Sequence, residues 1–154
     1  MKKLVVYFSA TGVTKNVASE IAQNIGADLF EIVPKQQYTS ADLNWHDANS
    51  RSSVEMKDRS SRPAVEDKVN DINQYDTIVL GFPVWWYTAP TIVNTFIEEN
   101  DLSGKKINVF VTSGSSGAEG AFIDLKETYP KLDFVAAKRL KPLDSTEELV
   151  NWIK

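Results

Sequence analysis

A run of small polar residues near the start of the chain has the composition of an anion-binding turn. Ser9, Thr11 and Thr14 supply three hydroxyl groups around Gly12, directly after the apolar run 4–8. If a helix begins here, the free N–H groups of its first turn and the positive end of its dipole would attract a phosphate. An ordinary helix N-cap also favours Ser, Thr and Gly, so this stretch alone leaves both interpretations open.

A second stretch, residues 81–90, places three aromatic residues in a row between two prolines. Trp85, Trp86 and Tyr87 cannot all face one core, so some of them should be exposed and ready to stack on a flat ring. Because burial of a large aromatic side chain is favourable, its presence in a loop indicates a ligand or a partner that covers it. The alternative is a hydrophobic plug that closes the end of the core.

A third stretch, residues 112–120, is small, polar and rich in glycine, which leaves backbone donors and acceptors free for the edge of a ring. On its own it is also compatible with a plain loop. Glycine lets the backbone approach a ligand closely, and five of the seven glycines lie in the three stretches: Gly12, Gly81, Gly114, Gly117 and Gly120. Together the stretches describe an anion cradle, an aromatic wall and a polar rim, which suit a planar heterocycle that carries a phosphate.

These stretches form one site only if the elements between them bring them to one edge of the fold. Continuous apolar runs predict strands buried on both faces, at residues 4–8, 29–33, 77–82, 107–112 and 134–140. Segments of helical period predict helices at residues 13–25, 63–72, 90–97, 122–129 and 145–153. This alternation implies a parallel sheet covered on both faces, in which ligands bind beyond the carboxyl ends of the strands.

One connection, residues 34–62, is much longer than the roughly 4–6 residues usual in such folds. Its scattered apolar residues predict some helical turns fixed to the surface: Tyr38, Leu43, Trp45, Val54 and Met56. Its charged residues are expected to pair locally, in salt bridges of little energy each: Arg51, Glu55, Asp58 and Arg62.

The composition excludes several chemistries. The 154 residues contain no cysteine, which excludes disulfides, thiolate nucleophiles, iron–sulfur clusters and cysteine-bound zinc. His46 is the only histidine, and we interpret it as a surface or packing residue, so no metal site is expected. The net charge of −4 offers no basic field for nucleic acid. No apolar run approaches the roughly 18 residues of a membrane span, and the run 4–8 is too short for a secretion signal, so we expect a cytoplasmic protein with no membrane partner.

The chain resembles the flavodoxin family over essentially its whole length. Residues 9–14, Ser-Ala-Thr-Gly-Val-Thr, are similar to the phosphate-loop pattern (S/T)-x-T-G-x-T at the end of the family's first strand. Residues 81–86 and 113–117 resemble the second and third flavin loops of a bacterial branch, and residues 42–45 and 50–52 resemble the long insertion of that branch. The resemblance implies a flavodoxin-like three-layer α/β/α sandwich with a five-stranded parallel sheet in the order 2-1-3-4-5.

The resemblance also implies a single domain over residues 1–154 that binds FMN without a covalent link. The phosphate would be held by Ser9, Thr11, Gly12, Val13 and Thr14. The isoalloxazine would be lined by Pro83, Val84, Trp85, Trp86 and Tyr87, with Ser113, Gly114 and Gly117 on the opposite rim. In such a protein the flavin does the electron chemistry, while the chain tunes its potential through stacking, hydrogen bonding and charge.

Three hypotheses for the function remain open on this basis. The first is an electron-transfer flavodoxin that carries electrons between redox partner proteins, a reductase and an acceptor. The second is an FMN-dependent NAD(P)H oxidoreductase that acts on quinones or nitro compounds in a pocket formed by the insertion and the exposed tryptophans. The third is an interaction module without flavin, which a failure to take up FMN would establish.

Overall fold

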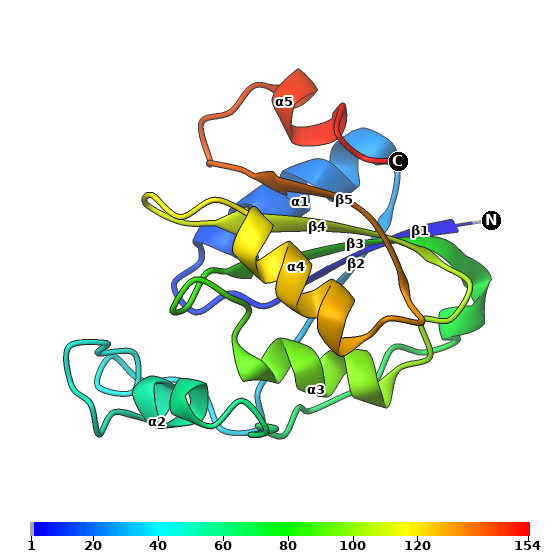
Figure 1. Cartoon of the computed structure of the whole chain (residues 1–154). Coiled ribbons are helices and arrows are strands. Elements are labelled where there is room, and N and C mark those ends of the chain that lie inside the picture. The colour runs from blue at the N-terminus through cyan, green and yellow to red at the C-terminus, as the bar shows by residue number, and fades with distance from the viewer. Residues whose placement is uncertain (1) are drawn as a thin grey trace.

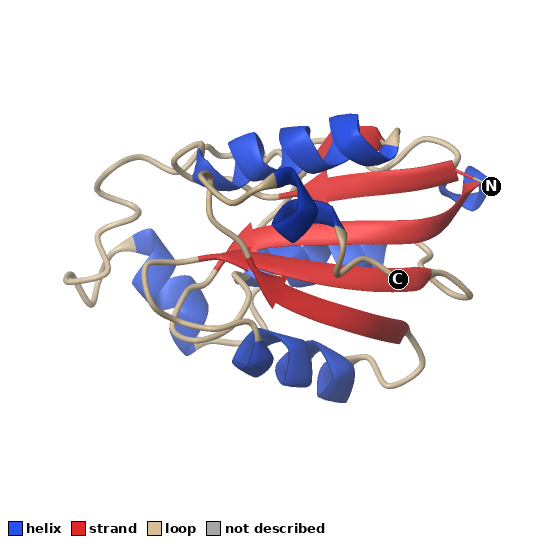
Figure 2. Cartoon of the chain, turned by 90° about the horizontal axis from the view of Figure 1, so that it is seen from above, coloured by secondary structure: helices blue, strands red, loops and turns tan. Residues whose placement is uncertain are grey.

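Five parallel strands form one sheet in the order β2-β1-β3-β4-β5, which confirms the expected fold (Figure 1). The computed structural model describes residues 2–154. The strands are β1 (Lys2–Tyr7), β2 (Asp28–Glu31), β3 (Tyr75–Pro83), β4 (Lys106–Thr112) and β5 (Asp133–Arg139). Figure 2 shows the strands side by side with their arrowheads toward one edge, so their carboxyl ends lie together.

Helices cover both faces of the sheet and complete three layers (Figure 1). They are α1 (Val13–Ile25), α2 (Arg51–Lys57), α3 (Thr91–Glu99), α4 (Glu119–Thr128) and α5 (Thr146–Val150), with a short 3-10 helix, η1 (Ile72–Gln74). α1 and α5 pack on one face, and α3 and α4 pack on the other. Within residues 2–154, no helix has the length and apolar character needed to span a bilayer.

Alternate residues of the inner strands face the two helical layers. Val5, Val79 and Phe110 pack toward α1 and α5, whereas Leu4 and Leu80 pack toward α3 and α4, and all five are buried. This burial on both faces explains why the strands are continuous apolar runs rather than alternating ones. Full burial of one such side chain contributes roughly 1.5–3 kcal/mol, so the sheet is a firm base for the loops at its carboxyl edge.

The helix expected over residues 63–72 does not form, and this expectation was wrong. The segment instead pairs with residues 33–35 through two backbone hydrogen bonds of 2.8 and 2.9 Å. Val65 is buried all the same. A spacing of four residues keeps side chains on one side of an extended chain as well as on one side of a helix. The apolar pattern therefore did not distinguish the two conformations.

The insertion, residues 34–62, contains the short helix α2, which confirms the expectation of helical turns. The Ser50 hydroxyl caps this helix by accepting a hydrogen bond from the Ser53 N–H at 3.3 Å. Met56 is buried on the inner side of α2, whereas Trp45 is 66% exposed. Trp45 is therefore not one of the residues that hold the insertion to the rest of the protein.

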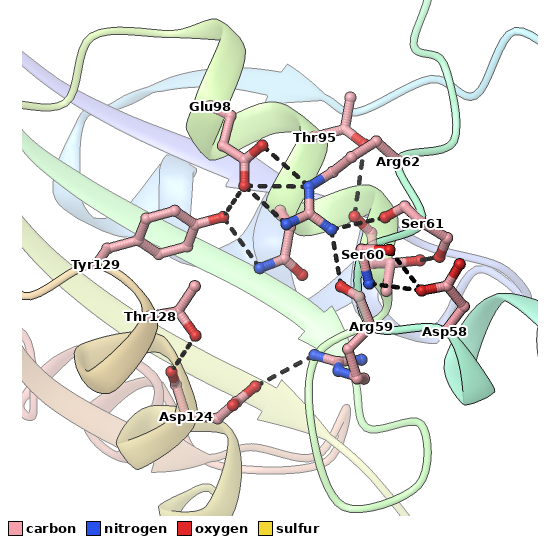
Figure 3. A network of polar contacts seen from close by, with 12 residues as sticks. Asp58, Arg59, Ser60, Ser61, Arg62, Thr95, Glu98, Asp124, Thr128 and Tyr129 are labelled. Carbon is pink, nitrogen blue, oxygen red and sulfur yellow. Dashed lines mark hydrogen bonds and ion pairs between the residues drawn. The ribbon is translucent and has the colours of Figure 1, made fainter.

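Two arginines of the insertion form ion pairs across the fold (Figure 3). Arg62 reaches Glu98 on α3 at 2.9 Å, and Arg59 reaches Asp124 on α4 at 3.2 Å. Tyr129 also donates a hydrogen bond to Glu98 at 2.6 Å. The expectation of local pairing was wrong for Arg62, because folding brings α3 beside a residue far from it in sequence. These pairs are partly exposed, so each contributes about 1 kcal/mol or less.

Candidate functional site

The three loops predicted from the sequence lie together at the carboxyl edge of the sheet, beside the point where the strand order reverses (Figure 1). They are also bonded to one another. The Phe8 N–H donates to the Gly81 carbonyl at 3.0 Å, and the Val84 N–H donates to the Thr112 carbonyl at 3.1 Å. The buried hydroxyl oxygens of Thr14 and Thr112 lie 2.7 Å apart. The tertiary structure therefore assembles one composite surface from the three loops.

The first loop leaves the start of α1 without a side-chain cap. Gly12 is the N-cap residue, with a φ of 97°, and no side chain among residues 2–154 accepts a hydrogen bond from the first turn. The Ser9 hydroxyl accepts from the Gly12 N–H at 3.0 Å, which shapes the loop ahead of the helix. The ordinary Ser or Thr N-cap is thus not formed. The N–H groups of Val13 and Thr14 remain available for an anion.

The two threonines of this loop are placed differently. Thr11 is exposed, and its hydroxyl is accessible at the mouth of the loop. Thr14 is only 2% exposed, and its hydroxyl is bonded to that of Thr112. Thr14 can offer an anion its backbone N–H, and its hydroxyl keeps a proton to donate when the Thr112 hydroxyl is the donor of their hydrogen bond.

The second loop makes a two-residue turn whose two central residues are aromatic. The Trp85 N–H donates to the Thr88 carbonyl at 2.9 Å, and the Thr88 N–H donates back at 3.1 Å. Trp86 and Tyr87, at the centre of the turn, have φ values of 47° and 67°. Glycine and asparagine dominate such positions, because the left-handed backbone conformation costs most other residues about 1–2 kcal/mol each. Trp86 is 44% exposed and Tyr87 78% exposed, so neither is a buried plug.

Trp85 is the fixed member of the aromatic group. Its half-buried ring meets Phe8 and Tyr38 edge to face, with centroid separations of 5.7 and 5.4 Å. The Tyr38 hydroxyl donates to Glu55 of α2 at 2.5 Å, and the Arg51 guanidinium lies 3.8 Å from the Tyr38 ring centre. Burial, together with the hydrogen bond to Glu55, raises the pKa of Tyr38. The insertion thus supports Trp85 through the ring of Tyr38, whose protonated hydroxyl is bonded to Glu55.

A cavity of about 420 Å³ lies between the second loop, the third loop and the insertion. Its lining consists of Leu43, Trp45, Ser52, Val84, Trp85, Trp86, Tyr87, Ser115 and Ser116. The Ser52 hydroxyl oxygen is buried and has no hydrogen-bond partner among residues 2–154. A buried polar atom in that state is rare and unfavourable in native proteins.

A second hollow, of about 560 Å³, shares Tyr87, Ser115 and Ser116 with the first cavity and runs along the third loop to the start of α4. Gly117 and Gly120 are in its lining. A β-carbon at Gly120 would come within 2.8 Å of the Tyr87 carbonyl oxygen, so a glycine is required for this approach. A glycine is also required at position 81, because a β-carbon on Gly81 would lie 2.0 Å from the Phe110 ring.

The third loop is held by a residue that the sequence did not single out. Arg139, the last residue of β5, donates to the carbonyl oxygens of Ser113 and Gly114. The Ser113 hydroxyl donates in turn to the Ser116 carbonyl. Ser113 and Gly114 therefore do not line the 420 Å³ cavity, whereas their neighbours Ser115 and Ser116 do.

Sequence reasoning placed part of this site and missed another part. Val84 and the aromatic triplet line the cavity, whereas Pro83 ends β3 and does not. The insertion supplies a third wall, made by Leu43, Trp45 and Ser52; a pocket at the insertion was expected under the oxidoreductase hypothesis, but these residues were not singled out as its lining. Trp45, an isolated tryptophan in a polar segment, was the feature of the sequence that could have indicated this wall. A larger hollow of about 680 Å³ lies beside Leu102 and Leu132, ahead of β4 and β5 at the opposite edge, and contains none of the loop residues.

Comparison with known proteins places the chain in a family. The family model described as Flavodoxin matches residues 2–154. A candidate flavoprotein from Bacteroides uniformis is 46% identical, with a TM-score of 0.94, and the alignment covers 98% of this chain and 96% of that one. A candidate flavoprotein from Bacteroides eggerthii is 44% identical, with a TM-score of 0.93 and coverage of 96% and 92%. This chain belongs to the flavodoxin family.

A more distant structure shares the fold. The flavoprotein from Lactobacillus acidophilus, solved in complex with FMN, is 23% identical, with a TM-score of 0.73 and coverage of 90% of this chain and 92% of that one. No protein with a curated description matches the chain.

Proposed function

We propose that this chain is a single flavodoxin-like domain, residues 1–154, that binds FMN noncovalently and transfers electrons between redox partner proteins. One observation carries the proposal. The uncapped start of α1 and the exposed aromatic turn at Trp86 and Tyr87 are presented at the same edge of the sheet. The first suits a phosphate and the second a flat ring. Family membership and the FMN complex of the Lactobacillus acidophilus flavoprotein support the same cofactor.

The residues present fit FMN. Space is open around the loops, since a β-carbon at Gly12, Gly114 or Gly117 would meet nothing within 4 Å. The cavity beside Trp86 has an aromatic lining and one buried hydroxyl without a partner, Ser52. Such a combination is what a planar ring with polar edges requires.

The phosphate would be held by neutral donors. These are the backbone N–H groups at the start of α1 and the hydroxyl groups of Ser9, Thr11 and Thr14. The positive end of the α1 dipole adds to their attraction. Binding of the phosphate should therefore depend on the geometry of Gly12 more than on any single charged side chain.

The ring would lie against the second loop. Trp85 is already packed edge to face on Phe8 and Tyr38, so it serves as a fixed wall. Trp86 is the more exposed of the two tryptophans, and we assign the stacking role to it. Trp45 and Ser52 would close the side formed by the insertion and exclude water from it.

Bound FMN would supply reversible uptake of electrons, and the chain would bind it, orient it and set its potential. The test begins with purified apoprotein titrated with FMN, with quenching of flavin fluorescence as the signal. Tight binding at one site supports the cofactor, whereas failure to bind FMN would favour the interaction module without flavin.

A reductive titration of the FMN-loaded protein under anaerobic conditions then separates the two redox hypotheses. A carrier should take up its electrons in two resolved one-electron steps. A single two-electron step, with steady oxidation of NAD(P)H by a quinone in the absence of partner proteins, would favour the oxidoreductase. The cytoplasmic location stays a prediction, which fractionation of the native cells would test.

A further inference from the structure

Within residues 2–154, Arg139 makes the only side-chain hydrogen bonds from β5 to the third loop. Its Nη2 lies 3.0 Å from the Ser113 carbonyl oxygen and 2.8 Å from the Gly114 carbonyl oxygen, and its Nε lies 3.3 Å from the former. The planar guanidinium thus bridges two consecutive carbonyl groups, which the single ammonium of a lysine does poorly. The neighbouring loop residues are small and supply no aromatic ring to hold the loop otherwise.

This contact sets the direction of two peptide planes. In a trans peptide, the carbonyl of one residue and the N–H of the next point in opposite directions. The N–H groups of Gly114 and Ser115 therefore point away from the Arg139 guanidinium. Neither N–H has a hydrogen-bond partner among residues 2–154. Ser115 lines the same cavity as Trp86.

We propose that Arg139 is a positioning residue that, by holding the Ser113 and Gly114 carbonyls, turns the Ser115 N–H toward the edge of the bound flavin ring. The inference rests on the proposed function, because it concerns how this chain holds FMN. Without Arg139 the loop would have to be ordered by the ligand itself, at a cost in conformational entropy. The positive charge of the guanidinium beside the third loop would also favour the more negative reduced flavin and so raise its potential.

The test separates position from charge. Two ligands are compared: FMN, and riboflavin, which lacks the phosphate. In Arg139→Gln the affinity for each should fall by about tenfold or more, because several charge-assisted hydrogen bonds are lost. Arg139→Lys keeps the charge but cannot bridge both carbonyls. Its affinities should fall as well, while the midpoint potential of its FMN complex stays close to that of the wild type.

Lys138→Gln is the matched control. Lys138 precedes Arg139 on β5, pairs with Phe110 and faces the other side of the sheet, so its loss removes the same charge without touching the loop. Its riboflavin affinity should stay within about twofold of the wild type. The melting temperature of each apoprotein reports whether the variant is folded, and Arg139→Lys serves as the test if Arg139→Gln is not.

Three results decide the matter. Equal weakening of FMN and riboflavin binding supports the positioning role. Unchanged riboflavin affinity in Arg139→Gln overturns the positioning role. This holds also if the FMN affinity alone falls, because such a result means that Arg139 attracts the phosphate by its charge. If the wild-type protein binds neither ligand, the proposed function fails. The proposed role of Arg139 then fails as well, because it requires a bound flavin.

Discussion

The ring of Tyr38 in the insertion meets the ring of Trp85 in the second loop edge to face, with their centroids 5.4 Å apart. Tyr38 is held at its other end by the hydrogen bond to Glu55 of α2. The insertion is therefore part of the support of the candidate flavin site and not a separate appendage. The ion pairs of Arg59 and Arg62 with α4 and α3 extend the same support across the face of the molecule (Figure 3).

Tyr38→Phe should destabilise the apoprotein by about 1–2 kcal/mol, because Glu55 loses a half-buried donor while the ring stays. The pKa of Tyr38 is raised in the folded state, so the protonated phenol contributes stability that is fully present below its ordinary pKa near 10 and is lost as the pH rises above it. The stability difference between wild type and variant should be constant from about pH 7 to pH 10 and should shrink above that. Urea unfolding at several pH values measures it. A difference that grows above pH 10 would contradict the assignment.

Thr11→Glu should abolish phosphate recognition. A carboxylate in the first loop would face the phosphate dianion, and FMN affinity should fall by roughly 100-fold. Riboflavin has no phosphate, so its affinity should change little. Thr11→Gln has nearly the same shape without the charge and is the control. Equal FMN affinity for the glutamate and glutamine variants would refute the placement of the phosphate at this loop.

The double variant Trp86→Asn, Tyr87→Gly should be more stable than the wild-type apoprotein by about 1–2 kcal/mol, because these residue types adopt positive φ with less strain. Its FMN affinity should fall by about tenfold or more as the aromatic contact is lost. Trp86→Phe keeps both the strain and a stacking ring, and it should bind FMN nearly as the wild type does. Thermal unfolding and FMN titration of the three proteins measure both effects. A double variant that binds FMN normally would show that this turn is not the stacking site.

Ser52→Ala should leave the apoprotein as stable as the wild type or slightly more stable, because the lost hydroxyl has no partner there. FMN affinity should drop by about 3- to 10-fold if this hydroxyl bonds the ligand. Ser53→Ala is the matched control on the same helix, since its hydroxyl is bonded to Ser50 at 2.9 Å and not to the cavity. That variant should lose stability but keep its FMN affinity. The opposite pattern would remove Ser52 from the site.

The sheet and its three loops could be predicted from the sequence. The central strands are buried on both faces, so their apolar runs are continuous and their ends are marked by turn residues. Once the strands alternate with helices, their carboxyl ends meet at one edge, and the residues that follow them form the site. Residues 63–72 show the limit of this reasoning, because a spacing of four residues fits an extended chain as well as a helix.

The completion of the site depends on contacts that form only when the chain folds. The roles proposed for Ser52 and Arg139 depend on folding, which places one beside the aromatic turn and the other beside the third loop. The positive φ values at Trp86 and Tyr87 are equally hidden, because residue type alone argues against them. The periodicity of apolar residues indicates which side of an element faces the core. The contacts of the site join residues from different elements, and a local sequence pattern contains no information on the distances between them.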